Sequence, residues 1–133
     1  MLEKLASTVF LIDALAIGLG AFGHGLAVRQ VHAAIDQFPI EADIHSMIYV
    51  VWYFVSGCMF IFGMTLIWVW LRVRAGDSRP LVAATFIGIL YIGIGAFGFV
   101  YRGGDLFMAF FAVLGSVLLL SAYGMARAAH ANV

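Results

Sequence analysis

Four long apolar stretches constrain this chain more than any other feature. They cover residues 8–28, 48–71, 81–101 and 106–126. As an α-helix rising 1.5 Å per residue, each is long enough to cross a hydrocarbon core about 30 Å thick. In lipid, only α-helices and closed β-barrels pair all of their backbone hydrogen-bonding groups. Barrel strands would alternate apolar with polar residues, and these continuous apolar stretches do not. The sequence therefore predicts an all-α integral membrane four-helix bundle that forms one domain over residues 1–133.

The composition supports a lipid environment. Hydrophobic residues make up 65% of the chain and charged residues only 11%, whereas a soluble domain is typically about 25% charged. The net charge is zero, which provides no general attraction to nucleic acid. The one cysteine, Cys58, can form neither an internal disulfide nor a zinc site by itself. We therefore expect the lipid bilayer, and no nucleic acid, as a partner.

The cationic residues near the ends of the four stretches are unevenly distributed. Short cytoplasmic loops carry an excess of lysine and arginine. One side of the predicted bundle holds Lys4, Arg72, Arg74, Arg79 and Arg127, and the other holds Arg29 and Arg102. This bias predicts that both termini are cytoplasmic (N-in/C-in) and that the 29–47 linker is outside. We expect the membrane to be a bacterial cytoplasmic membrane.

A short string occurs twice. The first stretch contains IGLGAFG at Ile17–Gly23 and the third contains IGIGAFG at Ile92–Gly98, identical at six of seven positions. One interpretation is a tandem repeat of two helical hairpins. The other is chance, because small residues are common in membrane helices. The Gly-x-Gly-x-x-Gly pattern within the string does not indicate a dinucleotide site, because it lies inside an apolar helix rather than after a strand.

Small residues mark the faces on which membrane helices approach closely. The first stretch has such a seam, formed by Ala14, Gly18, Ala21 and Gly25. The third has another, formed by Gly88, Gly95 and Gly98 with Tyr91. Both indicate helix packing or, alternatively, room for a flat cofactor. The last stretch has few polar residues, so we expect it to face lipid or a partner.

Polar residues inside the spans are costly in lipid and are candidates for function. Asp13 is the only carboxylate within a span, and His24 follows eleven residues later on nearly the same helical face. At steps of four, three and four, another face carries His45, Tyr49, Trp52 and Ser56. We expect a polar cavity that opens outward. Its expected walls are His24, His45, Tyr49 and Tyr91, and its expected rim is Asp36, Glu41, Asp43 and Arg102.

Several kinds of site fit such a cavity, because imidazole with carboxylate suits zinc, iron, copper or manganese and also transfers protons. The candidate metal ligands are Glu41, Asp43 and His45, with His24, His32 and Asp36 nearby. The candidate catalytic residues are His24, Asp43 and His45. The candidate cofactor-binding residues are His24, His45, Tyr49, Trp52 and Tyr91. Haem, a metal ion, and a lipid or quinone all stay open as cofactors.

Three functions fit these features. The first is an accessory subunit of, or a small-ligand-binding component within, a larger membrane complex, because twelve phenylalanines and six methionines offer contact surface to a homo- or hetero-oligomeric partner. The second is a small membrane enzyme that performs acid–base or redox chemistry on a lipid, quinone or isoprenoid. The third is a proton-coupled transporter in which Asp13 is the proton-coupling residue.

Overall fold

The computed structural model describes residues 2–131, and every regular element in that range is a helix. The elements are α1 (Leu2–Leu26), α2 (Val28–Ile35), α3 (Ala42–Arg74), α4 (Leu81–Tyr101) and α5 (Leu106–Ala131). Four helical segments in this range are long and apolar enough to cross a membrane, with α1 and α2 counted together. The prediction of an all-α chain with four candidate spans is therefore confirmed.

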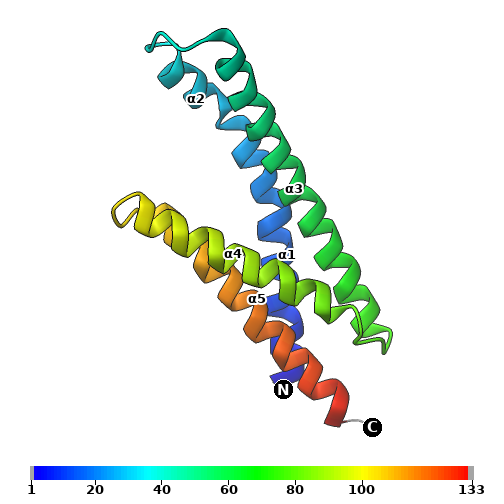
Figure 1. The fold of residues 1–133 in the computed structure, drawn as a ribbon. Coiled ribbons are helices and arrows are strands. Elements are labelled where there is room, and N and C mark those ends of the chain that lie inside the picture. The colour runs from blue at the N-terminus through cyan, green and yellow to red at the C-terminus, as the bar shows by residue number, and fades with distance from the viewer. Residues whose placement is uncertain (1, 132–133) are drawn as a thin grey trace.

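The helices form two antiparallel hairpins (Figure 1). In one, α1 packs along α3; in the other, α4 packs along α5. The second hairpin crosses the lower part of the first, where α5 contacts α1 and α4 contacts α3. The tip formed by α2 and the start of α3 lies away from the crossing. We call this part, residues 28–49, the α2–α3 tip.

The helices extend beyond the predicted spans at several ends, and α1 begins at Leu2 rather than at residue 8. α4 begins and ends where predicted, and α5 begins where predicted but runs on to Ala131. α3 begins at Ala42, before the predicted residue 48, because helix formation does not stop where hydropathy falls. The chain turns through 36–41, which includes Pro39, a residue without a backbone donor that disfavours helix.

The core lies where the two hairpins cross. Its largest fully buried side chains are Phe10 and Ile17 of α1, Leu66 and Val69 of α3, and Leu118 of α5, and α4 contributes the fully buried Ala84. The last span, α5, was expected to face lipid or a partner; it exposes large apolar side chains such as Leu106 and Leu120 on one face, and it also contacts α4 and α1 and buries Leu118 at 0% exposure. Its apolar side chains interlock at the crossing, and only its outer face stays exposed.

Glycines permit the close approach within each hairpin. A Cβ atom at Gly63 would fall on the backbone of Gly18 across the α1–α3 contact. A Cβ atom at Gly95 would likewise fall on Ala112 across the α4–α5 contact. Both seams therefore serve helix packing. The repeated string does not make equivalent contacts, because Gly93, which corresponds to Gly18, has no neighbour there.

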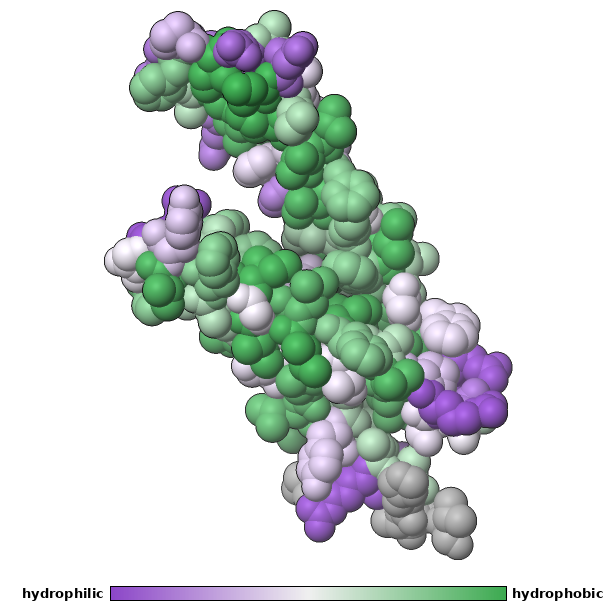
Figure 2. Space-filling view, in the orientation of Figure 1, coloured by the Kyte–Doolittle hydropathy of each residue, from purple (hydrophilic) through white to green (hydrophobic). Residues whose placement is uncertain are grey.

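The molecular surface between the chain turns is mostly apolar. Figure 2 shows hydrophobic residues covering most of the visible face, with hydrophilic residues gathered at the ends of the hairpins. Exposed large apolar side chains occur on all four long helices, including Leu19, Phe54, Phe97 and Leu120. Such a surface is solvated well by lipid and poorly by water.

The α4–α5 turn is held by its own side chains. Gly103 and Gly104 adopt positive φ angles of 67° and 95°, a conformation that glycine adopts without steric cost. The Asp105 carboxylate accepts a hydrogen bond from the Phe107 backbone N–H at 2.9 Å, so it caps the start of α5. Arg102 pairs with Asp105 at 2.9 Å. Arg102 therefore does not belong to the rim of acids predicted around the 29–47 linker.

Candidate functional site

The α2–α3 tip brings three potential metal ligands together. His32 and Asp36 follow one another at i and i+4 at the end of α2, so they share one face. The turn after α2 returns the chain so that His45, in the first turns of α3, faces them. One donor atom from each of the three residues lies within 4.8 Å of the others. His45 Nε2 is 3.2 Å from Asp36 Oδ1. We call this group the His–Asp–His cluster.

Tyr49 lies directly behind the cluster. It follows His45 by one helical turn of α3, and its hydroxyl oxygen is 2.5 Å from Nδ1 of His32. The Tyr49 and His32 rings are stacked with centroids 3.9 Å apart, and the His45 ring lies edge-on at 4.9 Å. These contacts fix the orientation of both imidazoles. Tyr49, a predicted cofactor-binding residue, therefore supports the two histidines rather than lining an open cavity.

The cluster shares only His45 with the predicted metal set. Glu41 is the exposed residue before α3, and Asp43 is exposed in its first turn. Neither belongs to the cluster. Among the described side chains, no hydrogen bond joins Asp43 to either predicted catalytic histidine. The sequence signal that identifies the observed group is the His32–Asp36 spacing of four on a helical extension of the first span.

His24 belongs to a second group, which ties α1 to α3. The Trp52 indole N–H donates to the His24 carbonyl at 2.7 Å, and the two rings stack at 4.1 Å. The Ser56 hydroxyl donates to the Trp52 carbonyl at 3.1 Å, so His24 Nδ1–H donates to Ser56 Oγ at 2.9 Å. The group is therefore a closed set of hydrogen bonds between two helices, and it explains His24, Trp52 and Ser56 as helix-packing residues.

The two histidines among the predicted cofactor-binding residues, His24 and His45, do not lie together, as a haem bound between them would require. His24 lies against Trp52, which is seven residues, or about 10 Å of helix rise, from His45 along α3. His45 is instead engaged with Asp36. The described structure thus places the imidazoles in two separate groups, and a haem held between them would require both groups to rearrange.

Asp13 and Tyr91 form a third polar group, in the core. Each is 4% exposed. Asp13 Oδ2 and the Tyr91 hydroxyl are buried without a hydrogen-bond partner among the described residues. Both side chains lie in the buried interior where the two hairpins cross. Tyr91 also packs against Phe62 and Phe111. It is therefore a core residue near Asp13, rather than a wall of the expected outer cavity.

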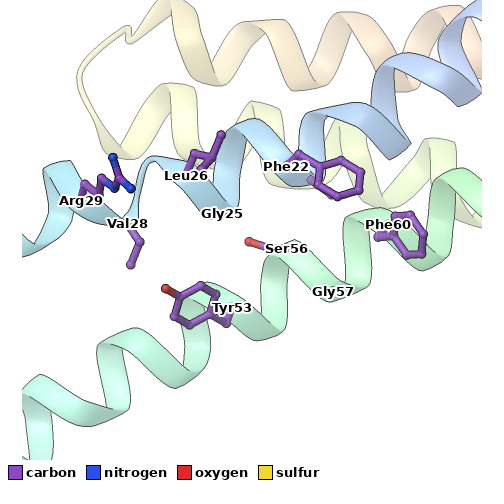
Figure 3. A pocket seen from close by; sticks show the side chains of 10 residues that line it. Phe22, Gly25, Leu26, Val28, Arg29, Tyr53, Ser56, Gly57 and Phe60 are labelled. Atoms are coloured by element: carbon purple, nitrogen blue, oxygen red, sulfur yellow. The ribbon is translucent and has the colours of Figure 1, made fainter.

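A groove of about 610 Å³ lies between α1 and α3, between the core and the α2–α3 tip (Figure 3). Its lining from α1 and α2 is Ala21, Phe22, Gly25, Leu26, Val28 and Arg29. Its lining from α3 is Tyr53, Ser56, Gly57 and Phe60. The groove is largely apolar, and a single cationic side chain stands at its outer end. It does not include His24 or His45.

Similarity to known proteins does not guide the interpretation of these groups. No protein-family model matches the chain, and neither a curated protein nor a solved structure is similar to it. Of the groups described, the His–Asp–His cluster has the donor set most specific to one chemistry, because two imidazoles and a carboxylate on one face are typical transition-metal ligands.

Proposed function

We propose that this chain is a multi-pass membrane protein that binds a divalent transition-metal ion at its α2–α3 tip, as a small-ligand-binding component of a larger membrane complex. The observation that carries this proposal is the His–Asp–His cluster, in which three donor atoms lie within 4.8 Å of one another. Both termini are cytoplasmic and the tip is outside, in accord with the lysine and arginine bias.

The spacing of the donor atoms suits a metal ion after a small adjustment. Two ligands at about 2.1 Å from a tetrahedral zinc ion lie about 3.4 Å apart. His45 Nε2 and Asp36 Oδ1 are already 3.2 Å apart, and His32 must approach them by a short side-chain movement. Three protein ligands leave a coordination position for water or an exogenous group, as in catalytic rather than purely structural sites.

Tyr49 is placed to orient His32 for metal binding. A metal-bound imidazole commonly donates its other ring N–H to a second group, which fixes its orientation. When His32 carries its proton on Nδ1, it donates to the Tyr49 oxygen and leaves the lone pair of Nε2 free. Nδ1 lies 2.5 Å from that oxygen, so this hydrogen bond engages Nδ1 and leaves Nε2 to face a metal ion.

Helix length supports the placement of the tip outside the membrane. α3 has 33 residues and is about 50 Å long, whereas α4 has 21 residues and is about 32 Å long. The hydrocarbon core is about 30 Å thick. An α3 that begins its span near residue 48 and ends it near the cytoplasmic arginines therefore projects its first turns, with α2, beyond the lipid.

Exposed apolar side chains on the projecting tip support a partner. Phe38 is 66% exposed, Ile44 51% and Met47 65%. Beyond the hydrocarbon such side chains face water unless another chain covers them, and exposed apolar patches commonly mark interaction sites. The tip thus combines a polar ligand group with an apolar contact surface, as expected of a component of a larger assembly.

Two measurements on the wild-type protein test this function. Calorimetric titration with Zn²⁺ in detergent should give one site per chain, and binding should weaken on acidification because protons compete for the imidazoles. Absence of saturable binding contradicts the metal assignment. Separately, single cysteines at Phe38 and Ser78 in a Cys58→Ser background should label from outside and from the cytoplasm, respectively. The reverse pattern contradicts the orientation.

The buried Asp13–Tyr91 group favours a second candidate function, proton-coupled transport. A carboxyl group without a protein partner in the core is costly in lipid and is expected mainly where it carries a proton or ion. The two unpartnered atoms, Asp13 Oδ2 and the Tyr91 hydroxyl, support this candidate. Proton flux into proteoliposomes should be abolished by Asp13→Asn. Flux equal to that of protein-free vesicles for the wild type contradicts it.

A further inference from the structure

We propose that the groove between α1 and α3 binds one phospholipid of the outer leaflet, with an acyl chain along the groove and the phosphate on Arg29. This inference rests on the membrane orientation given under the proposed function, and it is independent of metal binding at the tip. It assigns a ligand class to a surface that neither the metal cluster nor the Asp13–Tyr91 group uses.

The groove has the shape and lining of an acyl-chain site. Its volume of about 610 Å³ falls within the range of small-molecule pockets. Three small residues, Ala21, Gly25 and Gly57, form part of its lining, and a Cβ atom at Gly57 would meet no neighbour within 4 Å. At the deep end the Phe22 and Phe60 rings meet edge-to-face at 5.8 Å. An apolar chain therefore has both space and contact surface there.

The outer end of the groove is cationic. Arg29 lines it and forms no ion pair among the described side chains, whereas three other arginines, Arg72, Arg79 and Arg102, are each paired with an aspartate. A guanidinium recognises phosphate by paired, charge-assisted hydrogen bonds. The unpaired charge beside an apolar groove is complementary to a ligand with one anionic group and a hydrocarbon tail.

The level of the groove along the membrane normal favours a phospholipid among such ligands. Arg29 directly follows the apolar stretch 8–28, so it lies where lipid phosphates lie when that stretch spans the hydrocarbon. Tyr53, also in the lining, places an aromatic ring with a hydroxyl near the same level, and tyrosine is enriched at this interface. Phe22 and Phe60 then lie at the depth of the acyl chains (Figure 3).

Native mass spectrometry of the detergent-solubilised full chain tests this site. The probe is phosphatidylglycerol, titrated against diacylglycerol with the same chains. Gly57→Leu places a bulky apolar side chain in the groove, at a position where the added Cβ atom meets no neighbour within 4 Å. Gly23→Leu is the matched control, because Gly23 also has open space but does not line the groove. Arg29→Gln removes the charge while keeping a polar side chain.

The wild type should hold one phosphatidylglycerol about tenfold more tightly than diacylglycerol, as expected for charge-assisted hydrogen bonds. Gly57→Leu should lose this site, Arg29→Gln should bind both lipids equally, and Gly23→Leu should match the wild type. Equal binding of both lipids by the wild type, or unchanged binding in Gly57→Leu, overturns the inference. A wild-type dimer that Gly57→Leu dissociates would instead assign the groove to a second copy and also overturns it.

Failure of the lipid proposal can be distinguished from failure of the metal proposal. His32→Ala should leave phosphatidylglycerol binding unchanged, and Gly57→Leu should leave Zn²⁺ binding unchanged. Lipid binding that falls in His32→Ala as much as in Gly57→Leu would contradict an independent groove. The cysteine-labelling pattern tests the shared assumption of orientation, because labelling of position 38 from the cytoplasm would move the groove to the inner leaflet.

Discussion

The Tyr49 hydroxyl oxygen lies 2.5 Å from Nδ1 of His32, and the two rings stack at 3.9 Å. These residues are 17 positions apart and belong to α3 and α2, so the contact joins the two sides of the tip. It also connects the fold to the proposed chemistry, because the same hydrogen bond that holds α2 against α3 orients His32, a proposed metal ligand.

We predict that Tyr49→Phe weakens Zn²⁺ binding about ten- to hundredfold, the usual effect of losing a group that orients a ligand. The ring stays, so packing is largely kept, while His32 loses its hydrogen-bond partner. Calorimetric titration measures the change. Tyr53→Phe is the control, since Tyr53 lies one turn further along α3 and does not contact the cluster. Equal Zn²⁺ affinity in the two variants would show that Tyr49 does not support the metal site.

The closeness of α1 and α3 at Gly63 gives a prediction about stability. Gly63→Ala should destabilise the protein by about 1–3 kcal/mol, as expected for overpacking, because the new methyl group meets the backbone of Gly18. Gly57→Ala is the matched control, since it also adds a methyl group in α3 but meets no atom within 4 Å. Reversible unfolding in mixed micelles compares them. Equal stabilities of the two variants would mean that α1 and α3 do not approach each other closely at Gly18 and Gly63.

The buried polar groups in the core should cost stability. Asp13→Leu should stabilise the protein by about 1–3 kcal/mol, because it removes a carboxyl oxygen that lacks a partner. Tyr91→Phe should be neutral or stabilising by up to about 1 kcal/mol for the same reason. Leu118→Ala is the contrast, with an expected loss of about 2–5 kcal/mol for a fully buried leucine. Strong destabilisation by Asp13→Leu would show that the carboxyl group has a partner in the membrane.

The α3–α4 turn should respond to pH through Asp77. Hydrogen bonds from Arg79 and Arg72 hold the pKa of this carboxyl well below its usual range. A carboxyl whose pKa is lower in the folded state stabilises the fold above its unfolded pKa of about 3.9 and loses that contribution as the pH falls further. Asp77→Asn should therefore lower the unfolding temperature at pH 7. The difference from wild type should shrink below about pH 4, and a constant difference would contradict the ion-pair explanation.

Hydropathy was sufficient for the four candidate spans because it reports a one-dimensional property, the length of an apolar run. It identified α4 with both boundaries correct, and the small-residue rule identified the Gly18 and Gly95 contacts. It did not show that the hairpins cross, so Tyr91 was expected at the outer cavity although it lies in the core beside Asp13. The crossing depends on how side chains of α1 and α5 interlock, which no single helix pattern contains.

The candidate site was only half predictable for a related reason. Helical spacing correctly placed His45 and Tyr49 on one face of α3, and it could also place His32 and Asp36 on one face of α2. Which of the acids in the 29–47 linker meets His45 depends on the path of the chain through Pro39. That path brings Asp36 to His45 and leaves Glu41 and Asp43 exposed.

Zinc stoichiometry in a panel of four variants tests the metal assignment most directly. The purified variants His32→Ala, Asp36→Asn, Glu41→Gln and Asp43→Asn are loaded with Zn²⁺, dialysed and measured by plasma mass spectrometry. We predict one zinc ion per chain in the wild type, Glu41→Gln and Asp43→Asn, and loss of zinc in His32→Ala and Asp36→Asn. Equal zinc in all four variants, or loss only in the Glu41 and Asp43 variants, would contradict a metal site formed by His32, Asp36 and His45.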